Sequence, residues 1–546
     1  MRVLGVEGTA WCASAAVHDT ATDETFIESD AYEPESGGIH PREAAEHMGD
    51  AIPRVVDAAV EYADEQGGID AVAFSQGPGL GPCLRIAGTA ARALAGTLDV
   101  PLVGVNHMVA HLEIGRHSAG FDSPVCLNAS GANAHLLGYH NGRYRVLGET
   151  MDTGVGNAID KFTRHVGWSH PGGPKVEAAA EDGEYVDLPY VVKGMDFSFS
   201  GIMSAAKDAV DEGISASEAI GGSSERCSDG APVEDVCFSL QEHIFAMLTE
   251  VSERALSLTG SDELVLGGGV GQNDRLREML ATMCEERGAA FHAPEPRFLR
   301  DNAGMIAVLG AKMAAAGDTV PIAESAVDPN FRPDEVPVTW REGESVAVPS
   351  GLSGPKRGAE AIVERHDDTV VKRRVPKRYR HEELDANLRR DRTVLEARLT
   401  SEARRQGVPT PLVHDVNVPE ATLTLQHVGD QDLAGGLTTA RARTLGGYLA
   451  RLHEAGVVHG DPTTRNVRVG GDDLYLIDFG LGYYSGHPED HAMDLHVFEG
   501  SVAGTAADPE PLVRAFEDGY EAERGERDEE SVLARLAEVR GRGRYQ

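Results

Sequence analysis

The stretch ELVLGGGVGQNDRL (263–276) contains the pattern that sets the fold of the first half of the chain. A short apolar run is followed by a turn of small residues and then by a polar stretch that can form a helix. Four more strand-like runs, VLGVEG, AVAFSQG, PLVGVN and PVCLNAS, begin at residues 3, 71, 101 and 124. Strand-like runs that alternate with helical stretches predict an α/β fold for residues 1 to about 320.

Four of the turns in this region are rich in small residues, at 5–10, 75–85, 128–135 and 266–274. Backbone N–H groups at such turns can bind phosphate. One turn alone is weak evidence, because glycine also serves turns that bind nothing. Several such turns, far apart in one α/β unit, suggest two lobes that close on a nucleotide. That arrangement resembles the actin, hexokinase and sugar-kinase (ASKHA) superfamily.

The length of 546 residues predicts two or three domains. A proline-rich, acidic segment at 315–355 has no sustained period, as expected of a linker or of a strap across a surface. We therefore place one domain at 1–325, a linker at 326–350 and a second domain at 351–546. The segment 212–235 is rich in Ser, Gly and acidic residues and is expected to be an exposed insertion.

The net charge of -38 would ordinarily argue against a polyanionic partner. The chain has only eight lysines against 42 arginines, and this composition resembles adaptation to a salty cytoplasm. The total charge therefore says little about partners. Six cysteines without a CxxC pair predict reduced thiols and a cytoplasmic protein. No segment has the apolar length of a membrane span, so no membrane partner is expected.

The stretch VNHMVAHLE (105–113) holds two histidines, His107 and His111, that lie one turn apart if it is helical. A zinc peptidase of the HExxH type would carry glutamate where this chain has Met108. That substitution counts against a metallopeptidase, which stays an alternative. Two buried histidines without a ligand are the other alternative. Asp301, in RFLRDNAGMIA, favours a metal site because it offers a third ligand.

The motifs NHMVAH, NASGANAH, GVGNAIDKFTRHVG, HPGGPKVE, DFSFSG, GGGVGQNDRL and LRDNAGMIA, in this order, resemble the tRNA threonylcarbamoyl transferase of the KEOPS complex. The resemblance implies that His107, His111 and Asp301 bind one iron or zinc ion. Asn128 stands where archaeal relatives usually carry tyrosine, so its amide oxygen or water would be the fourth ligand. The residues implied to bind threonylcarbamoyl-adenylate are Asn128, Ala129, Ser130, Gly131, Ala132, Asp160, Gly173, Glu177 and Asn273.

The implied reaction moves the threonylcarbamoyl group from this adenylate to the exocyclic amine of the adenosine 3′ of the anticodon, in tRNAs that read codons beginning with A. Adenylate is a good leaving group, so the protein mainly has to hold the two substrates in line. A nucleotide-dependent scaffold without turnover is an alternative. Taken by itself, Asp160 next to Lys161 has the simpler interpretation of a surface ion pair.

The second unit carries kinase motifs in VVHGDPTTRNVRV (457–469) and LYLIDFGLG (474–482). Their spacing predicts Asp461 as the catalytic base or orienting group, with Asn466 and Asp478 on magnesium. Upstream, Lys372 lies in a strand-like run and is expected to pair with Glu396 and reach the ATP phosphates.

The second unit resembles the small KEOPS-associated atypical kinase, which implies a small bilobal protein-kinase-like fold, ATP and magnesium. In this interpretation the kinase or ATPase regulates the transferase together with other KEOPS subunits. A pseudokinase scaffold is the alternative. The cover over the nucleotide lacks a GxGxxG motif, and we place it in GLSGPKRGAEA. The candidate ATP contacts are Leu352, Ser353, Gly354, Gly358, Ala359, Glu360, Lys372 and Glu396.

Two basic stretches, KRRVPKRYR (372–380) and VRGRGRYQ (539–546), are expected to be solvated faces or a frayed tail. The sharper hypothesis is that the tail contacts tRNA, with Tyr545 stacking on a base. Deletion of residues 540–546 would then weaken tRNA binding and leave nucleotide binding unchanged.

Overall fold

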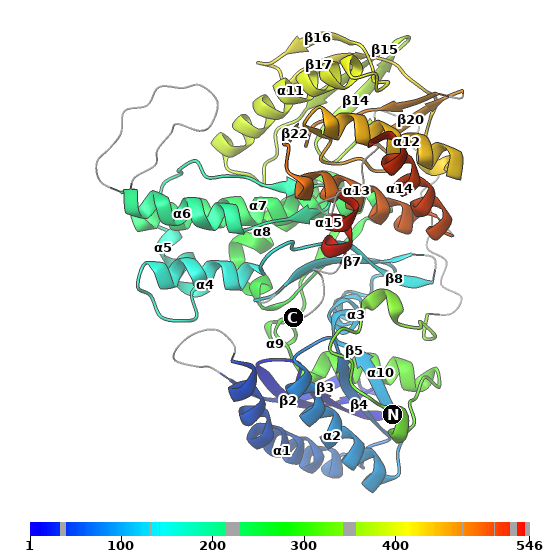
Figure 1. The fold of residues 1–546 in the computed structure, drawn as a ribbon. Helices are drawn as coiled ribbons and strands as arrows, with labels where there is room; N and C mark the ends of the chain where they lie inside the picture. Colours follow the sequence, from blue (N-terminus) through cyan, green and yellow to red (C-terminus); the bar gives the residue numbers. More distant parts are fainter. Residues whose placement is uncertain are drawn as a thin grey trace.

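The computed structural model describes residues 1–32, 40–131, 133–140, 142–212, 230–341, 356–471, 473–506, 508–524 and 532–540. Figure 1 shows three bodies, one above another. The N-terminal lobe, in blue, lies at the bottom, a second lobe in cyan and green lies in the middle, and the C-terminal unit, in yellow to red, lies at the top. The predicted α/β class is confirmed, because mixed sheets alternate with helices along the chain.

The first lobe is built on a mixed five-stranded sheet with the order β3-β2-β1-β4-β5. β1 pairs antiparallel with β2 and parallel with β4. Leu4 and Val6 pack in one cluster with helices α1 and α2, and helix α10 covers the other face of the sheet. The elements are β1 Arg2–Glu7, β2 Cys12–Asp19, β3 Glu24–Ala31, β4 Ala71–Gly77, β5 Leu102–Asn106, α1 Pro41–Glu65, α2 Gly81–Leu98 and α10 Ala303–Ala315.

The second lobe repeats this topology with the order β12-β11-β6-β7-β8. β6 pairs antiparallel with β7 and parallel with β11, as β1 does with β2 and β4. Its core contains the apolar faces of helices α4 to α8. The elements are β6 Val125–Ala129, β7 Ala134–His140, β8 Arg143–Glu149, β9 Val192–Lys193, β10 Asp196–Phe197, β11 Glu263–Gly267, β12 Ala290–His292, α4 Val155–His165, α5 Gly173–Ala180, α6 Ser200–Glu212, α7 Val233–Thr259, η1 Gly269–Gln272, α8 Asp274–Arg287 and α9 Pro296–Leu299.

Helix α3 (His107–Ala119) lies between the two lobes. It packs against α10 of the first lobe and against β6 and β11 of the second (Figure 1). The helix begins directly after β5, because the Asn106 side chain accepts hydrogen bonds from the backbone N–H groups of Met108 and Val109, both at 3.1 Å. The predicted pair of histidines is therefore held on a buried helix at the junction of the lobes.

The chain beyond α10 runs as a strap along the first lobe and then reaches the second lobe, where η3 packs against β8 and Arg341 lies over the ring of Tyr139. The backbone N–H of Val320 donates to the Leu102 carbonyl at 2.8 Å, and that of Asp328 to the Gln76 carbonyl at 2.8 Å. The strap contains the 3-10 turns η2 Ile322–Glu324 and η3 Pro333–Glu335. Residues 342–350 of the expected linker, and 213–229 of the expected insertion, lie outside the described residues.

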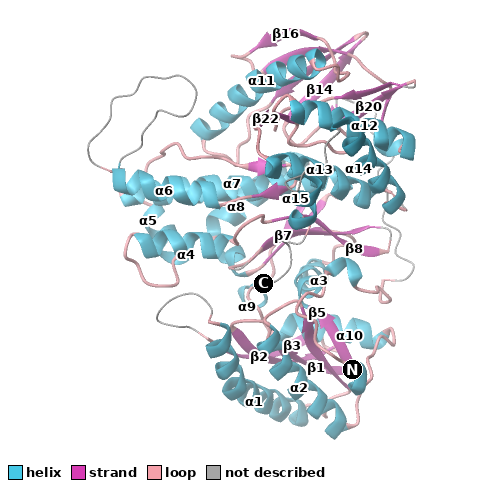
Figure 2. Cartoon of the chain, viewed as in Figure 1, coloured by secondary structure: helices cyan, strands magenta, loops and turns pink. Residues whose placement is uncertain are grey.

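The C-terminal unit has an antiparallel sheet at one end and helices at the other (Figure 2). The sheet order is β13-β14-β15-β17-β16, and helix α11 packs against β16 and β17. The elements are β13 Lys356–Arg357, β14 Ala361–His366, β15 Thr369–Arg374, β16 Val413–Asn417, β17 Thr422–Gln426, β18 Gln431–Asp432, β19 Val457–Val458, β20 Val467–Gly470, β21 Asp473–Leu476, β22 Tyr483–Tyr484, α11 Glu382–Arg405, η4 Leu433–Gly435, α12 Thr439–Glu454, α13 Pro488–Thr505, α14 Glu510–Arg524 and α15 Val532–Val539.

Among the helices in the described ranges, none combines the length and apolar character needed to cross a membrane. The five cysteines in those ranges are free and buried, as expected for reduced thiols: Cys12, Cys83, Cys126, Cys237 and Cys284.

Candidate metal centre and nucleotide sites

The structure brings together the three predicted metal ligands at the junction of the lobes. The Nε2 atoms of His107 and His111 each lie 3.4 Å from Oδ1 of Asp301. The two rings are 4.9 Å apart at an interplanar angle of 87°. Helix α3 supplies both histidines, and the loop just before α10 supplies the carboxylate, so elements from distant parts of the sequence converge on one point.

Glu7, at the end of β1, is a residue that sequence reasoning missed. Its Oε2 lies 3.2 Å from Nδ1 of His107. Its Oε1 accepts hydrogen bonds from the backbone N–H of Thr9 at 2.8 Å and from the Thr9 hydroxyl at 2.6 Å. Ser75 also donates to this carboxylate. A carboxylate fixed in this way orients the imidazole and leaves Nε2 of His107 facing Asp301.

The electrostatics of this centre favour a cation. Burial lowers the pKa of His107, but the carboxylates of Glu7 and Asp301 outweigh burial and raise it to about 10. Burial lowers the pKa of His111, and Asp301 opposes this only in part. Neither ring nitrogen of His111 has a hydrogen-bond partner among the described residues, although both are buried. Two carboxylates beside an unsatisfied neutral imidazole fit a metal ion with nitrogen and oxygen ligands.

Asn128, the candidate fourth ligand, is the last residue but one of β6. A Cβ atom on Gly267 would lie 3.5 Å from Cβ of His111 and 3.6 Å from Oδ1 of Asn128, so the amide borders the histidine. The Asn128 Oδ1 atom is buried and has no hydrogen-bond partner in the described part of the chain. A buried oxygen of this kind is costly unless something unseen binds it, which keeps Asn128 as a candidate ligand.

The loop that follows Asn128 lies close to Gly156, on α4, and to Gly268, which follows β11. The Gly131 carbonyl accepts a hydrogen bond from the backbone N–H of Asn157 at 2.9 Å. A Cβ atom on Gly156 would lie only 2.7 Å from Cα of Gly131, so glycine allows the close approach. Gly268, with φ of 84°, lies against the Ala129 carbonyl. Ser130 donates to the carbonyl of residue 133 at 2.7 Å, and Ala132 lies outside the described residues.

Asp160, on α4, holds the turn that leads into α5. Its Oδ1 accepts a hydrogen bond from the backbone N–H of Gly172 at 2.8 Å, and its Oδ2 lies 3.1 Å from Nδ1 of His170. Gly173 is the first residue of α5. The ordered contacts of Asp160 are thus with this turn, where the simpler interpretation placed a surface ion pair with Lys161.

Glu177 and Asn273 are brought side by side by α5 and α8. The Oε1 atom of Glu177 accepts a hydrogen bond from the backbone N–H of Asp274 at 3.2 Å. Asn273 caps α8 through a 3.1 Å bond to the backbone N–H of Leu276 and donates to Gln241 at 3.2 Å. These contacts link the loop at 129–131 to α4, α4 to the turn before α5, and α5 to the start of α8.

A second constellation lies in the C-terminal unit. Nζ of Lys372, on β15, lies 2.8 Å and 3.0 Å from the two carboxylate oxygens of Glu396, on α11. It also lies 2.6 Å from Oδ1 of Asp478. The expected pairing of Lys372 with Glu396 is present. Gly358 and Ala359 lie in the turn before β14, and Leu352, Ser353 and Gly354 lie outside the described residues.

Asp461 faces Asn466 and Asp478 across the same site. Nδ2 of Asn466 donates to Oδ2 of Asp461 at 2.9 Å and to its carbonyl at 2.8 Å. Asp478 has φ of 65°, a left-handed conformation that turns its side chain back toward Lys372. Burial raises the pKa of Asp478, but the charge of Lys372 outweighs it and holds the pKa well below its ordinary value.

Arg254, which sequence reasoning also missed, enters this site from α7 of the second lobe. Its guanidinium lies 3.3 Å from Oδ2 of Asp461 and 3.1 Å from Oε1 of Glu360. Glu360 is also one of the expected ATP contacts. Burial raises the pKa of Asp461 to about 7, although the Arg254 charge acts in the opposite direction. The two units therefore share one polar site.

Lys377 and Arg380 of the stretch 372–380 belong to this interface, so the expectation of a solvated face is wrong for these two residues, whereas Arg373 and Arg378 are exposed. Lys377 Nζ lies 2.6 Å from Glu253, and Arg380 lies 2.7 Å from Glu250. Both basic side chains are buried, with 3% and 7% of each residue exposed. The basic residues pair with acidic residues of α7 that are buried in turn. Residues 541–546 of the tail lie outside the described residues, and Arg540 pairs with Glu499 and Glu517.

Replacement of Tyr190 by phenylalanine is expected to lower the free energy of unfolding by about 1.5 kcal/mol, because a hydrogen bond to a charged group is lost. The Tyr190 hydroxyl donates to Glu250 at 2.7 Å, inside the cluster formed with Arg380 and Arg392. Urea unfolding followed by fluorescence measures the change. Tyr62→Phe is the matched control, because Tyr62 stacks on Phe26 in the first lobe. Equal unfolding midpoints for wild type and Tyr190→Phe would contradict this.

The family model for tRNA N6-adenosine threonylcarbamoyltransferase matches residues 21–308. The chain belongs to this family. The predicted activity class, tRNA modification by threonylcarbamoyl transfer, is therefore confirmed. The matched region contains the candidate metal ligands His107, His111 and Asp301 and all the described candidate adenylate contacts.

Relatives of this transferase extend over the whole chain. A protein of Halobacterium salinarum is 70% identical, over 100% of this chain and 99% of its own length. A protein of Methanospirillum hungatei is 49% identical, also over 100% of this chain and 99% of its own length. Both are named probable bifunctional tRNA threonylcarbamoyladenosine biosynthesis proteins. The C-terminal unit is thus a part of these relatives as well.

Proposed function

We propose that residues 1–325 form a two-lobed ASKHA-like transferase that acts on threonylcarbamoyl-adenylate and tRNA. The observation that carries the proposal is the convergence of His107, His111 and Asp301 at the junction of two lobes with the same strand order. The series of contacts from the 129–131 loop through α4 and α5 to the start of α8 supports an extended ligand-binding region beside that centre. Its amide, carboxylate and backbone groups suit the ribose, phosphate and threonyl parts of such a ligand.

In the proposed reaction the protein mainly positions the adenylate and the tRNA adenosine. The exocyclic nitrogen of the tRNA adenosine attacks the carbamoyl carbon, the bond from that carbon to the phosphate oxygen breaks, and AMP leaves with the electron pair. The nitrogen loses one proton to solvent. A metal ion held by His107, His111 and Asp301 would supply Lewis-acid stabilisation of the phosphate and carbonyl oxygens. Glu7 orients His107, and Asp160 holds the turn at Gly172 against the ligand surface.

The donor set of this centre suits zinc or ferrous iron. Two imidazoles and a carboxylate are ligands that both ions accept, and Asn128 or water would complete the coordination. The same set without a glutamate at position 108 supports acyl transfer to tRNA over peptide hydrolysis.

Incubation of the full chain with threonylcarbamoyl-adenylate and unmodified tRNA tests the proposal. Mass spectrometry of the digested tRNA is expected to show threonylcarbamoyladenosine, and casein is expected to remain intact in a parallel reaction. Absence of the modified nucleoside with a metal-loaded chain would reject the transferase. Cleavage of casein that a chelator abolishes would support the metallopeptidase.

For residues 351–546 we propose a small bilobal kinase or ATPase. Lys372 would hold the ATP phosphates, Asn466 and Asp478 would bind magnesium, and Asp461 would act as base or orienting group. The intact Lys372–Glu396 pair supports an active unit over a pseudokinase. The names of the full-length relatives support a bifunctional enzyme. Regulation of the transferase, other KEOPS subunits as partners and a cytoplasmic location complete the proposal, and the free thiols support the last of these.

The rate of ATP hydrolysis is expected to rise with pH through about 7, where Asp461 loses its proton and becomes able to act as a base. Arg254→Gln removes a charge that lowers the pKa of Asp461, so the rise is expected to move at least about one unit toward higher pH. Initial rates measured across this range with saturating magnesium and ATP test it. The matched control is Arg465→Gln, whose guanidinium lies at the same interface and donates to the Ser257 carbonyl. An unchanged profile in Arg254→Gln contradicts the assignment.

A further inference from the structure

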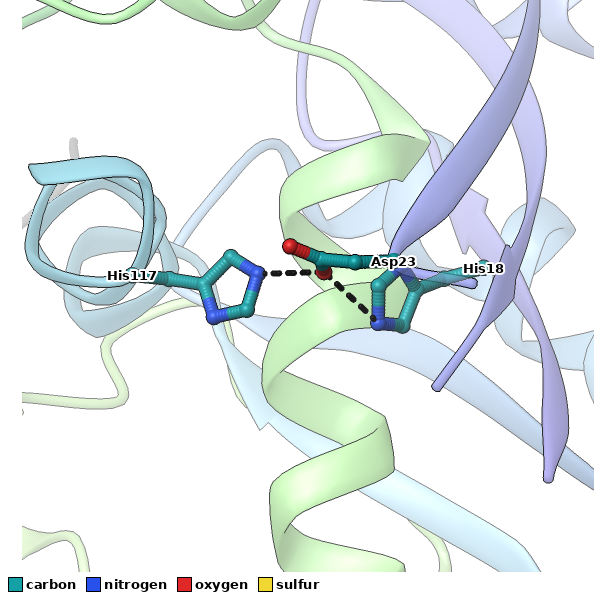
Figure 3. Close-up of side chains that lie close together, drawn as sticks. All are labelled: His18, Asp23 and His117. Atoms are coloured by element: carbon teal, nitrogen blue, oxygen red, sulfur yellow. Dashed lines mark hydrogen bonds and ion pairs between the residues drawn. The ribbon is translucent and has the colours of Figure 1, made fainter. Parts of the chain in front are cut away.

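A second group of two histidines and one carboxylate lies outside the candidate centre, at the opposite end of α3. His117 comes from the last turn of α3, His18 from β2 and Asp23 from the turn that joins β2 to β3 (Figure 3). Nε2 of His117 lies 2.8 Å from Oδ1 of Asp23, and Nε2 of His18 lies 3.9 Å from the same oxygen. The side chains point toward one another from three separate segments (Figure 3).

The neighbours of His18 fix the orientation of its ring. Nδ1 of His18 lies 3.0 Å from the Thr25 hydroxyl on β3, so this nitrogen has a partner and Nε2 is turned toward Asp23. The residue is buried, with 3% exposed, and burial lowers its pKa together with the charge of His117. A polar neighbour that fixes one nitrogen of an imidazole while the other faces a carboxylate is the usual arrangement around a metal ligand.

Hydrogen bonding alone leaves this arrangement incomplete. The separation of 3.9 Å between His18 Nε2 and Asp23 Oδ1 is too long for a hydrogen bond. If Nδ1 of the neutral ring carries the proton, the lone pair of Nε2 faces a carboxylate oxygen, which is repulsive unless a cation lies between them. The positive charge of Lys312, on α10, also lowers the pKa of His18, but Lys312 is paired with Glu113 at 2.9 Å.

We propose that His18, Asp23 and His117 bind a second divalent transition-metal ion, of the zinc class. The three ligand atoms lie within 4.8 Å of one another. A tetrahedral zinc ion with bonds of about 2.0–2.1 Å holds its ligand atoms roughly 3.3 Å apart, between the two distances observed here. Asp23 is exposed, with 66% of its side chain accessible, so water can supply the fourth ligand.

Such an ion would be structural. It would tie the turn between β2 and β3 to the end of α3, the helix whose first turns carry His107 and His111. The same β2 strand contributes Ser14, whose hydroxyl accepts a hydrogen bond from the backbone N–H of Ala303 at 3.1 Å, two residues after Asp301. The second ion would therefore fix both segments that supply the ligands of the first centre.

Cobalt(II) replacement on the full chain tests the second site. The chain is stripped with a chelator, dialysed and titrated with Co(II), whose absorption in the visible region reports its coordination. With excess magnesium present to fill the site proposed at Asn466 and Asp478, wild type is expected to bind two equivalents of Co(II), and His117→Ala and Asp23→Asn one each. His107→Ala is also expected to retain one equivalent, and its spectrum should be that of the His18 site. His107→Ala/His117→Ala should retain none.

Two variants keep this result interpretable. His165→Ala is the matched control, because His165 is an exposed histidine paired with Asp211 at 3.0 Å and is expected to leave the stoichiometry at two. Asp23→Asn alters an exposed turn and guards against the misfolding that a change at buried His18 could cause. A wild-type stoichiometry in His117→Ala and Asp23→Asn would overturn the second site. Loss of one equivalent in His107→Ala alone would leave the proposed transferase centre standing.

Discussion

His107→Ala is expected to lower the rate of threonylcarbamoyl transfer on the order of 10²–10³-fold, a loss of about 3–4 kcal/mol of transition-state stabilisation. His107 is the residue through which Glu7 and Asp301 meet, with contacts of 3.2 Å and 3.4 Å. Its removal would take away one of the two proposed imidazole ligands and leave the buried Glu7 carboxylate with only Thr9 and Ser75 as partners among the described residues. Both effects weaken metal binding, so the metal content of the purified chain is expected to fall with the rate.

The measurement is the initial rate of threonylcarbamoyladenosine formation, followed by mass spectrometry beside elemental analysis of the same sample. His165→Ala is the matched control, because it removes an exposed histidine paired with Asp211 from α4 of the second lobe. A His107→Ala variant that keeps its fold, has lost the central ion and still works at the wild-type rate would contradict a catalytic role for that ion. Positioning of the two substrates by the protein would then account for the whole rate enhancement.

Much of the first unit could be predicted from local pattern. The five strand-like runs quoted from the sequence became β1, β4, β5, β6 and β11, because each is a short apolar run that is followed by small or polar residues. The i, i+4 spacing of His107 and His111 placed both rings on one face of a helix. The position of Asp301 next to α3 could not be predicted from spacing, because only the fold brings the two segments together.

The role of Glu7 could not be predicted, because it depends on His107, which only the fold brings next to it. In GVEGTA it looks like one polar residue in a glycine-rich turn suited to phosphate. The structure shows it buried, bonded to Thr9 and facing His107, one hundred positions away in the sequence. A carboxylate in an apolar strand was the available signal, because an unpaired buried charge is costly and requires a partner.

The interface between the units was hidden for a related reason. KRRVPKRYR has the composition of a solvated face, and the acidic residues of α7 have that of an ordinary polar helix. Lys377 and Arg380 are buried only because they pair with Glu253 and Glu250 of α7. A single sequence does not show which surfaces meet. Arg254 belongs to no motif, yet it reaches Asp461, so a residue of the second lobe contributes to the polar site of the C-terminal unit. The shared strand order of the two lobes was likewise invisible, since topology repeats here without a repeat in the residues.

Asp461→Asn is expected to lower ATP hydrolysis or phosphoryl transfer by the C-terminal unit about 10²–10³-fold. Asparagine has nearly the same shape and can still bond to Asn466, now 2.9 Å from Oδ2 of Asp461, but it cannot accept a proton. Burial raises the pKa of the native carboxyl to about 7, which suits a group that exchanges protons near neutral pH. The loss is therefore expected in the turnover number, with the Michaelis constant for ATP nearly unchanged.

Release of labelled phosphate from ATP measures this turnover in the full chain, and nucleotide binding followed by calorimetry separates it from affinity. Asp473→Asn is the matched control, because Asp473 is an exposed carboxylate at the start of β21 in the same unit. Wild-type turnover in Asp461→Asn would remove the catalytic assignment of Asp461, whereas no turnover in the wild-type chain would favour a pseudokinase scaffold. If turnover falls but the formation of threonylcarbamoyladenosine persists, the two chemistries are separable. If both fall together, the contact of Arg254 with Asp461 is the structural route by which one site acts on the other.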